Sequence, residues 1–435
     1  MRGRAARTIA TGLTAVAVIA ACGGHDRSGP AVRPLPASVC GPVTYGGEGA
    51  PQLLVAASQS LQPPFSDHGL QNAQAAKLVL AERGWRAGRF NVGLQVCDEA
   101  DAATPLPSAR KCAANAREFA AERSVVAVTG PITSTCTAAM IPVLNRASGG
   151  PVGLVGMSAT YLGLTRAGPG VERGDPDRLY PTGTRNFVRI VAADDAQAAA
   201  GASYASGLGV RRPYVLHHDQ TWGIGIATAF ENAARKLGMT IAGNERWDPR
   251  ARSYGSLAER IRRSGADAVY LAGYAIENGP RLLRDLRAGL GRRVLVMGPD
   301  GFNMPAPLVE QAGAAAEGLV LTLASLPVAP LPPAGRRFAR DFEQRFGVLP
   351  CCYAVNAAQV MAVVLDAIAK SDGTRASVLR HLFRTHIHHG LLGDVAVDRY
   401  GDSSVRSIAV YRIRAARARF VTAITPSGEL LARTP

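Results

Sequence analysis

The chain has 435 residues, with 49 Lys and Arg against 33 Asp and Glu and a formal net charge of +16. Such a charge suits nucleic acid or an anionic membrane, but the basic residues are scattered arginines without a basic run or interleaved aromatics, so no nucleic-acid partner is expected. The length exceeds what one ordinary hydrophobic core fills, which predicts two lobes.

The N-terminus has the layout of an export signal, because arginines precede an uncharged apolar run from Ile9 to Ala21. A membrane span needs about 20 apolar residues, so this run is too short to be one. Residues 19–22, "IAAC", resemble the lipobox of bacterial lipoprotein signals, which implies cleavage after residue 21 and a lipid on Cys22. The alternative is an ordinary signal with an incidental cysteine. Residues 22–50 are then predicted to be a lipidated N-terminus and flexible tether, rich in Gly, Pro and Ser.

From residue 51 onward, short apolar runs alternate with amphipathic segments. Strands are predicted at "LLVAAS", "FNVGLQV", "VVAVTG" and "PVGLVG", with helices at 70–83, at 108–122 and near Thr135. This alternation is typical of a parallel sheet covered by helices on both faces.

The pattern then starts again with "NFVRIV" and with Asp194 as the expected N-cap of a helix. Strands "RPYVLHH", "MTIAGNERW", "DAVYLAGY", "RVLVMG" and "EGLVLTLAS" alternate with helices at 224–237, 254–264 and 281–290. Helices at 336–346, 354–369 and 376–384 follow, and the end reads as antiparallel strands joined by a Gly401-Asp402 turn.

The predicted fold class is therefore α/β, with two doubly wound Rossmann-like lobes joined by a multi-strand hinge. Because helices return after the second set of strands, the chain is expected to cross back between the lobes. The N-terminal lobe is predicted to comprise 51–193 plus 325–393, and the C-terminal lobe 194–324 plus 394–435.

Six cysteines remain after Cys22. An even number in an exported chain favours disulfides over metal binding, and the first four are predicted to form two bridges of open pairing: Cys40, Cys97, Cys112 and Cys136. Cys351 and Cys352 form either a vicinal disulfide or two plain thiols. There is no C-x-x-C, and His386, His388 and His389 read as a solvated loop, so no metal site is predicted.

Polar residues follow two strands of the first set, at the edge of the sheet where α/β proteins bind ligands. Thr133, Ser134 and Thr135 follow "VVAVTG", and Ser158 and Thr160 follow "PVGLVG". Hydroxyls together with the free N–H groups of a helix start suit a carboxylate. The alternative for either cluster alone is simple helix capping.

Aromatic and acidic residues follow the strands of the second set: Trp222, Tyr274, Glu277 and Asp300. An aromatic wall with an acid suits an ammonium group or an apolar side chain. For Trp222 alone, burial in the core is the simpler interpretation, and the same holds for the histidines at 217 and 218.

The order of these motifs resembles the type I periplasmic binding proteins, specifically the branched-chain amino-acid binding proteins of ABC importers. The resemblance runs from about residue 51 onward and is strongest in "DAVYLAGYAIENG", "VLVMGPDGF" and "AAEGLVLT". It implies an amino acid held between the lobes, permease subunits as partners, no cofactor and no catalysis. The residues that it implies for ligand binding are the hydroxyls Ser134 and Thr160 for the carboxylate, Ser158 beside them, the acid Asp194 at the lobe crossing, Asp300 for the amino group, and the aromatic wall Phe65, Trp222 and Tyr274.

Three departures from the family leave the ligand open: Trp222 stands where a tyrosine is common, Asp300 is shorter than the frequent glutamate, and residues 161–186 are longer than expected. An amide or aromatic-acid binder on the same fold and a ligand-sensing receptor lipoprotein are the alternatives. No complete enzyme motif is found. The S-x-x-K at Ser108–Lys111 stands without the other motifs that accompany it in enzymes, so it reads as a helix start. The expected location is the extracytoplasmic face of the cell membrane, held there by lipid.

Overall fold

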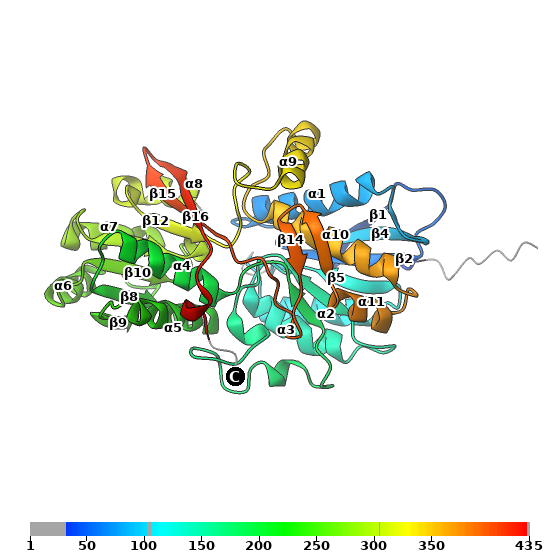
Figure 1. Cartoon of the computed structure of the whole chain (residues 1–435), viewed down its shortest axis with the longest axis horizontal. Helices are drawn as coiled ribbons and strands as arrows, with labels where there is room; N and C mark the ends of the chain where they lie inside the picture. Colours follow the sequence, from blue (N-terminus) through cyan, green and yellow to red (C-terminus); the bar gives the residue numbers. More distant parts are fainter. Residues whose placement is uncertain (1–31, 102–105, 304, 433–435) are drawn as a thin grey trace, which may run out of the picture.

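A computed structural model describes residues 32–101, 106–303 and 305–432. The predicted signal segment and Cys22 lie outside these described residues. The chain forms two α/β lobes that lie side by side, with several segments passing between them (Figure 1). Within the described ranges, no helix is both long enough and apolar enough to cross a bilayer.

The first lobe, called the N-lobe, is built on a sheet with the strand order β1-β4-β2-β5-β6-β7, and β3 pairs with β4. The central strands run parallel, whereas β1 is antiparallel to β4. The strands are β1 (Cys40–Thr44), β2 (Leu53–Gln59), β3 (Arg86–Ala87), β4 (Phe90–Asp98), β5 (Val125–Thr129), β6 (Gly153–Gly156) and β7 (Phe187–Arg189). Every residue of β2 is buried, as expected for a parallel strand covered on both faces.

Helices from two distant parts of the chain cover this sheet, in blue to cyan and in orange in Figure 1. The early ones are α1 (Ser66–Glu82), α2 (Ala109–Ala121) and α3 (Ser134–Asn145). The later ones are α10 (Ala354–Lys370) and α11 (Arg375–Leu382). Helix α9 (Pro333–Phe346), in yellow, lies apart from the sheet and packs on α10. Helix α10 packs along α1, and nearly all of its residues are buried.

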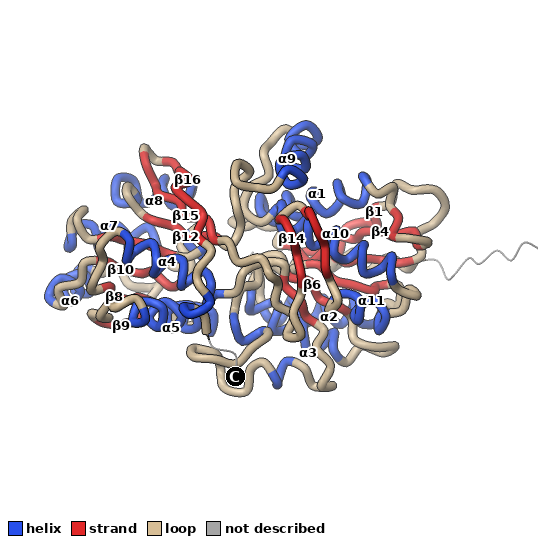
Figure 2. Tube along the Cα trace, in the orientation of Figure 1, coloured by secondary structure: helices blue, strands red, loops and turns tan. Residues whose placement is uncertain are grey.

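The second lobe, called the C-lobe, has the strand order β16-β15-β12-β11-β10-β8-β9. Its strands are β8 (Pro213–His217), β9 (Gly243–Arg246), β10 (Ala268–Ala272), β11 (Leu295–Gly298), β12 (Val320–Leu323), β15 (Ile408–Arg414) and β16 (Arg417–Ile424). Its helices are α4 (Asp194–Gly207), α5 (Thr221–Lys236), α6 (Gly255–Arg263), α7 (Gly279–Leu290) and α8 (Pro305–Ala312). Figure 2 shows helices packed around the central strands of each lobe, whereas the edge strand β16 is largely exposed. The predicted fold class is confirmed.

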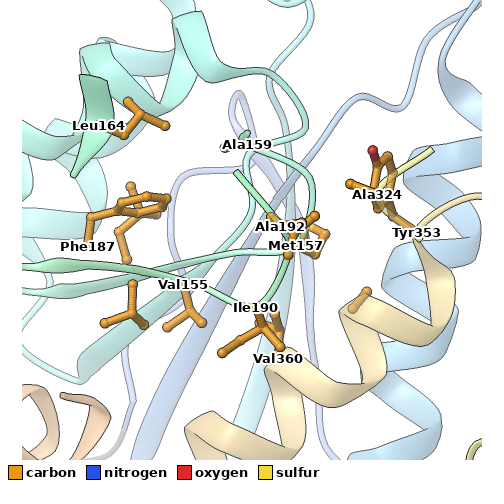
Figure 3. Close-up of a cluster of buried hydrophobic side chains, with 14 of the residues drawn as sticks. Val155, Met157, Ala159, Leu164, Phe187, Ile190, Ala192, Ala324, Tyr353 and Val360 are labelled. Carbon is orange, nitrogen blue, oxygen red and sulfur yellow. The ribbon is translucent and has the colours of Figure 1, made fainter. Parts of the chain in front are cut away.

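The chain passes from one lobe to the other between β7 and α4, between β12 and α9, and between the small hairpin β13 (His386–Gly390) and β14 (Gly393–Ala396) and strand β15. Beside these crossings, Val155, Ile190 and Val360 pack together in the core (Figure 3). Charged groups are buried there too: Asp402 pairs with Arg189 at 2.8 Å and with Arg166 at 2.6 Å. Breaking a buried pair of this kind costs far more than breaking one at the surface.

The predicted cysteine pairs form, as Cys40–Cys97 and Cys112–Cys136. This result corrects the predicted tether, since residues 22–50 are not flexible throughout. Leu35 is buried and its N–H donates to the side chain of Gln95 at 2.8 Å, and the strand that follows joins the N-lobe sheet. The glycine and proline content predicted flexibility, but a disulfide and an antiparallel strand pairing fix residues 40–44 on the N-lobe sheet.

Three local predictions are also wrong. The N-cap of α4 is Ala193, so Asp194 is the first residue inside the helix. The turn between β15 and β16 consists of Ala415 and Ala416, both with positive φ, whereas Gly401 and Asp402 lie in a separate turn before β15, between the bridged residues Val397 and Ser403. A turn built from two alanines carries no glycine signal to read. The three histidines lie on β13 rather than in a loop, although their side chains are exposed as expected.

Candidate ligand-binding cleft

A cavity of about 60 Å³ lies where the carboxyl ends of the two sets of parallel strands face each other. Seven of the eight residues singled out by the sequence line it: Phe65, Ser134, Ser158 and Thr160 from the N-lobe, and Trp222, Tyr274 and Asp300 from the C-lobe. The eighth, Asp194, lies behind this lining and is fully buried. The structure therefore brings side chains more than 200 residues apart in sequence to one place.

The N-lobe side of the cavity consists of hydroxyl groups held by backbone contacts. Thr133 caps α3, its hydroxyl accepting from the N–H of Cys136 at 3.3 Å, which makes the buried Ser134 the first residue of the helix. The Ser134 hydroxyl accepts from the N–H of Tyr161 at 3.1 Å. The Ser158 hydroxyl donates to the carbonyl of Ile132 at 2.8 Å. This wall is neutral and rich in hydrogen-bonding groups, as a carboxylate requires.

The C-lobe side is aromatic. Trp222 lies on the first turn of α5 and stacks on Tyr274, with ring centroids 4.7 Å apart and an interplanar angle of 20°. His218 packs edge-on against both rings, and its Nδ1 lies 2.8 Å from Oε2 of Glu277. Glu277 is thus engaged with His218 and does not line the cavity. The stacked rings have little freedom to move, and they form a preformed apolar surface.

Glycine permits this close packing at one position. A Cβ on Gly301 would lie 2.8 Å from the Trp222 ring and would collide with the carbonyl of Gly273. The backbone that carries Asp300 can therefore approach the indole only because residue 301 has no side chain.

Two carboxyl groups lie close together on the C-lobe side. Asp300 accepts from the Tyr353 hydroxyl at 2.6 Å and from the Gln197 amide at 3.2 Å. Burial raises the pKa of Asp300, and those two hydrogen bonds act in the opposite direction. Burial also raises the pKa of Asp194, to about 8, and the nearby Asp300 adds to the shift. An ammonium group entering the cavity would supply positive charge that favours ionisation of both acids.

The indole of Trp222 also links the two lobes. Its Nε1–H lies 3.1 Å from Asp194 Oδ1 in the C-lobe and 3.2 Å from Thr160 Oγ1 in the N-lobe. Trp222 is 4% exposed, so both interpretations of this residue hold: it is packed in the core and it lines the cavity. A ligand carboxylate that reaches Thr160 would have to share this hydroxyl with the indole.

The sequence alone missed several lining residues: His68, Asn72, Asn303, Leu323 and Tyr353. Most of them precede or lie within helices, whereas the residues predicted from the sequence directly follow strands. Tyr353 is the most consequential of these, because it comes from the segment before α10 and yet bonds Asp300. The adjacent Cys351 and Cys352 were the one feature of the sequence that set this segment apart.

Three larger cavities lie elsewhere. One of about 680 Å³ in the C-lobe has several arginines in its lining, among them Arg287 and Arg412. A second, of about 440 Å³, lies against Lys236 and the C-terminal segment. A third, of about 560 Å³, lies on the N-lobe beside Phe383 and Arg384. None of them combines hydroxyl groups of one lobe with rings and acids of the other, so the small cavity between the strand ends is the better candidate.

Two α/β lobes with a polar and aromatic cavity between them define a two-lobed binding protein. The model of the periplasmic binding protein family matches residues 55–418 of this chain. The chain therefore belongs to the periplasmic binding protein family, a family of binding proteins rather than of enzymes.

Among curated relatives, the chain is 26% identical over 198 residues to a Leu-, Ile-, Val-, Thr- and Ala-binding protein of Pseudomonas aeruginosa, which covers 45% of this chain and 52% of that protein. The matched part thus spans only about half of that relative's length. A leucine-binding protein of Thermotoga maritima superposes with a TM-score of 0.71 at 22% identity, covering 86% of this chain and 99% of the other. A solute-binding protein of R. palustris in complex with 4-hydroxybenzoate gives 0.70 at 17% identity, covering 86% and 97%. At these identities the two structures show a shared fold.

Proposed function

We propose that this protein is the lipid-anchored, extracytoplasmic substrate-binding protein of an ABC importer, and that it captures an amino acid, branched-chain or related, between its lobes. The observation that carries the proposal is the arrangement of the cavity: hydroxyl groups on one side and an acid with stacked rings on the other. An amino acid has the complementary arrangement, with a carboxylate and an ammonium group on one carbon.

Each wall has its own role in this proposal. Ser134, Ser158 and Thr160 take the ligand's carboxylate through hydroxyls and the N–H groups at the start of α3. Asp300 takes the ammonium group, with Tyr353 and Gln197 fixing the position of its carboxylate. The rings of Phe65, Trp222 and Tyr274 contact the side chain. Asp194 acts from behind, through its contact with the indole.

Ligand entry requires the lobes to move. The cavity of about 60 Å³ is far below the roughly 300 Å³ at the lower end of small-molecule pockets. A ligand that touches both walls stabilises one lobe arrangement through its differential affinity, and a permease can distinguish that arrangement from the unliganded one. The lobes proposed to move are 51–193 plus 325–393 against 194–324 plus 394–435, except that the third boundary belongs between β14 and β15, because a division at residue 394 would split the β13–β14 hairpin.

The lipid anchor is proposed from the "IAAC" pattern at residues 19–22. Acyl chains on Cys22 would hold the soluble lobes at the membrane surface, where the permease is. Replacing Cys22 with alanine should release the protein into the soluble fraction of the expressing cells. Permease and ATPase genes next to its gene would support transport, whereas a neighbouring sensor kinase would support the ligand-sensing alternative.

An aromatic acid is the second candidate ligand. The stacked Trp222 and Tyr274 favour it, because a flat ring can pack on them. The same fold in R. palustris holds 4-hydroxybenzoate. Such a ligand would use the hydroxyl wall but would leave Asp300 without a cationic partner.

Thermal melting of the soluble chain tests these proposals. Leucine at 100 times its dissociation constant should add about 2.7 kcal/mol to the stability. Asp300→Ala should abolish the leucine-dependent shift, because the charged contact to the ammonium group is lost. The shift is measured against the variant's own unliganded melt, since Tyr353 also loses its acceptor. Glu310→Ala, which changes an exposed acid on α8 outside the cavity, is the matched control and should keep the full shift.

An undiminished leucine shift in Asp300→Ala would remove Asp300 from the site. A shift with 4-hydroxybenzoate and none with any amino acid would replace the amino-acid proposal with the aromatic-acid one.

A further inference from the structure

Three side chains with metal-binding atoms meet at the rim of the cleft: His68, Cys351 and Cys352. A ring nitrogen of His68 and the two Sγ atoms all lie within 4.8 Å of one another. His68 is on the first turn of α1, and the cysteines belong to the segment that leads into α10. Because α1 and α10 pack along each other, residues some 280 positions apart form one compact cluster.

The backbone holds the cysteine pair against α1. The N–H of Cys351 donates to the side chain of Gln71 at 2.8 Å. Cys352 has a φ of 55°, in the left-handed region that residues with a side chain rarely adopt. The two Sγ atoms are 2.8 Å apart. The segment is thus fixed in a turn that presents both sulfurs together, half-buried, beside the histidine.

The local electrostatics suit a cation. The Asp67 carboxylate acts on all three groups and adds negative charge.

We propose that His68, Cys351 and Cys352 form a binding site for a thiophilic d10 metal ion, Zn²⁺ or Cu⁺, at the rim of the ligand cleft. Two sulfurs and one imidazole are the ligands that such ions prefer to carboxylates. Three ligands complete a trigonal Cu⁺ site, whereas Zn²⁺ would keep a fourth position for water or a ligand group. With Zn–S bonds of about 2.3 Å, two tetrahedral thiolates lie about 3.8 Å apart, so the sulfurs must separate by about 1 Å.

A metal at this site would act on the cavity. Tyr353 directly follows Cys352 and donates its hydroxyl to Asp300, while His68 itself lines the cavity. Fixing the cysteine pair to α1 would therefore fix the position of the tyrosine that holds the acid. Metal binding is expected to change the affinity for the cleft ligand, whatever that ligand is.

The test uses the soluble chain from residue 23 onward, which lacks Cys22, isolated without oxidation and with its two long-range disulfides intact. Titration of native thiols should find two per chain. Equilibrium dialysis against Zn²⁺, and competition for Cu⁺ with a chromophoric chelator, should each give up to one ion per chain and show which ion binds more tightly. Co²⁺ used as a spectroscopic probe should show thiolate-to-metal charge transfer.

Variants locate the ion. Cys351→Ser with Cys352→Ser should abolish the charge-transfer band, and His68→Ala should weaken binding at least about 100-fold, more than the loss of an outer-sphere partner. His386→Ala is the matched control, because His386 and His388 are exposed neighbours on β13 that could take up metal adventitiously. Unchanged melting temperatures show that the variants fold.

Two results would overturn the proposal. One is an isolated chain in which Cys351 and Cys352 form a disulfide and no ion binds. The other is metal uptake that survives the double cysteine variant and disappears in His386→Ala. Neither result affects the amino-acid proposal, which is judged by the leucine-dependent melt of the metal-free chain.

Discussion

The two walls of the cleft differ in chemistry. The N-lobe wall offers the neutral hydroxyls of Ser134, Ser158 and Thr160, whereas the C-lobe wall offers stacked rings and two acids whose pKa values are raised by burial. A hydroxyl wall suits any carboxylate, so it does little to select one carboxylate ligand over another. Selection between an amino acid and an aromatic acid is therefore expected from the C-lobe side, where Asp300 and the stacked rings lie.

The lobes also differ in how they are stabilised. Both long-range disulfides lie in the N-lobe, and within the described part of the C-lobe there is none. The C-lobe and the crossings depend on packing and on buried ion pairs such as Arg189–Asp402. Substitutions in the two regions should therefore separate effects on stability from effects on ligand choice.

The largest effect is expected from the longer disulfide. Cys40→Ala with Cys97→Ala opens a loop of 57 residues and should lower the free energy of unfolding by about 4 kcal/mol in the chain-entropy model. The matched pair Cys112→Ala with Cys136→Ala, with a separation of 24 residues, should cost about 3 kcal/mol. Denaturant titration measures both. Equal stability of the first variant and the wild type would show that β1 pairing alone holds this edge.

The next effect concerns the crossings. Asp402→Asn removes the acid from a buried cluster with Arg189 and Arg166, and should cost about 3 kcal/mol because Arg189 loses its ion-pair partner and Arg166 keeps only Asp195, at 3.5 Å. Burial alone would raise the pKa of Asp402, but the two arginines hold it below its usual value. Its contribution is therefore complete above about pH 4 and is lost as the pH falls below that value.

Stability curves against pH check this sign. The wild type should lose stability in acid more steeply than Asp402→Asn, whereas Glu310→Gln should follow the wild type. Parallel curves for the wild type and Asp402→Asn would contradict the role given to the two arginines.

A smaller effect distinguishes the two candidate ligands by pH. The pKa of Asp194 is raised to about 8, so below that pH an ammonium ligand must ionise an acid as it binds. Leucine affinity should rise by up to about tenfold, or 1.4 kcal/mol, between about pH 7 and pH 8 as the proton is released. The affinity for an anionic ligand such as 4-hydroxybenzoate should instead fall as the pH rises over the same interval, because the ionised acid repels it. Calorimetry in buffers of different ionisation enthalpy counts the released proton. A leucine affinity that does not change between pH 7 and pH 8 would contradict the coupling between the ligand's ammonium group and the ionisation of Asp194.

The smallest effect tests the shared wall. Thr160→Val removes one hydroxyl and keeps the side-chain shape. It should weaken the binding of any carboxylate ligand by about 1 kcal/mol, or roughly fivefold. Leucine and 4-hydroxybenzoate should be affected alike. Trp222 keeps its other acceptor, Asp194. Thr240→Val, an exposed position on the C-lobe, is the control. A loss confined to one of the two ligands would show that the N-lobe wall also selects.

Much of this architecture could be predicted from the sequence. Buried parallel strands read as apolar runs, and the polar residues directly after them were found because the carboxyl ends of parallel strands share one edge. Trp222 and Asp300 were found in this way, and the structure places both on the cavity. Their role in binding stays a prediction.

Other features could not be predicted, because they depend on contacts between distant segments. Periodicity gives no sign that Tyr353 reaches Asp300 or that the Trp222 indole bonds Thr160 in the other lobe. The apparent tether was misjudged for the same reason, since its order comes from Cys97 and Gln95 rather than from its own composition.

The sequence by itself determined the two α/β lobes, the cysteines that pair and the residues at the strand ends, because local periodicity and strand-end position are properties of neighbouring residues. The tertiary structure decided the disulfide pairing, the partners of each acid and the meeting of His68 with Cys351 and Cys352. These depend on which helices pack side by side after the chain has crossed between the lobes, and that packing is fixed by long-range burial of apolar surface.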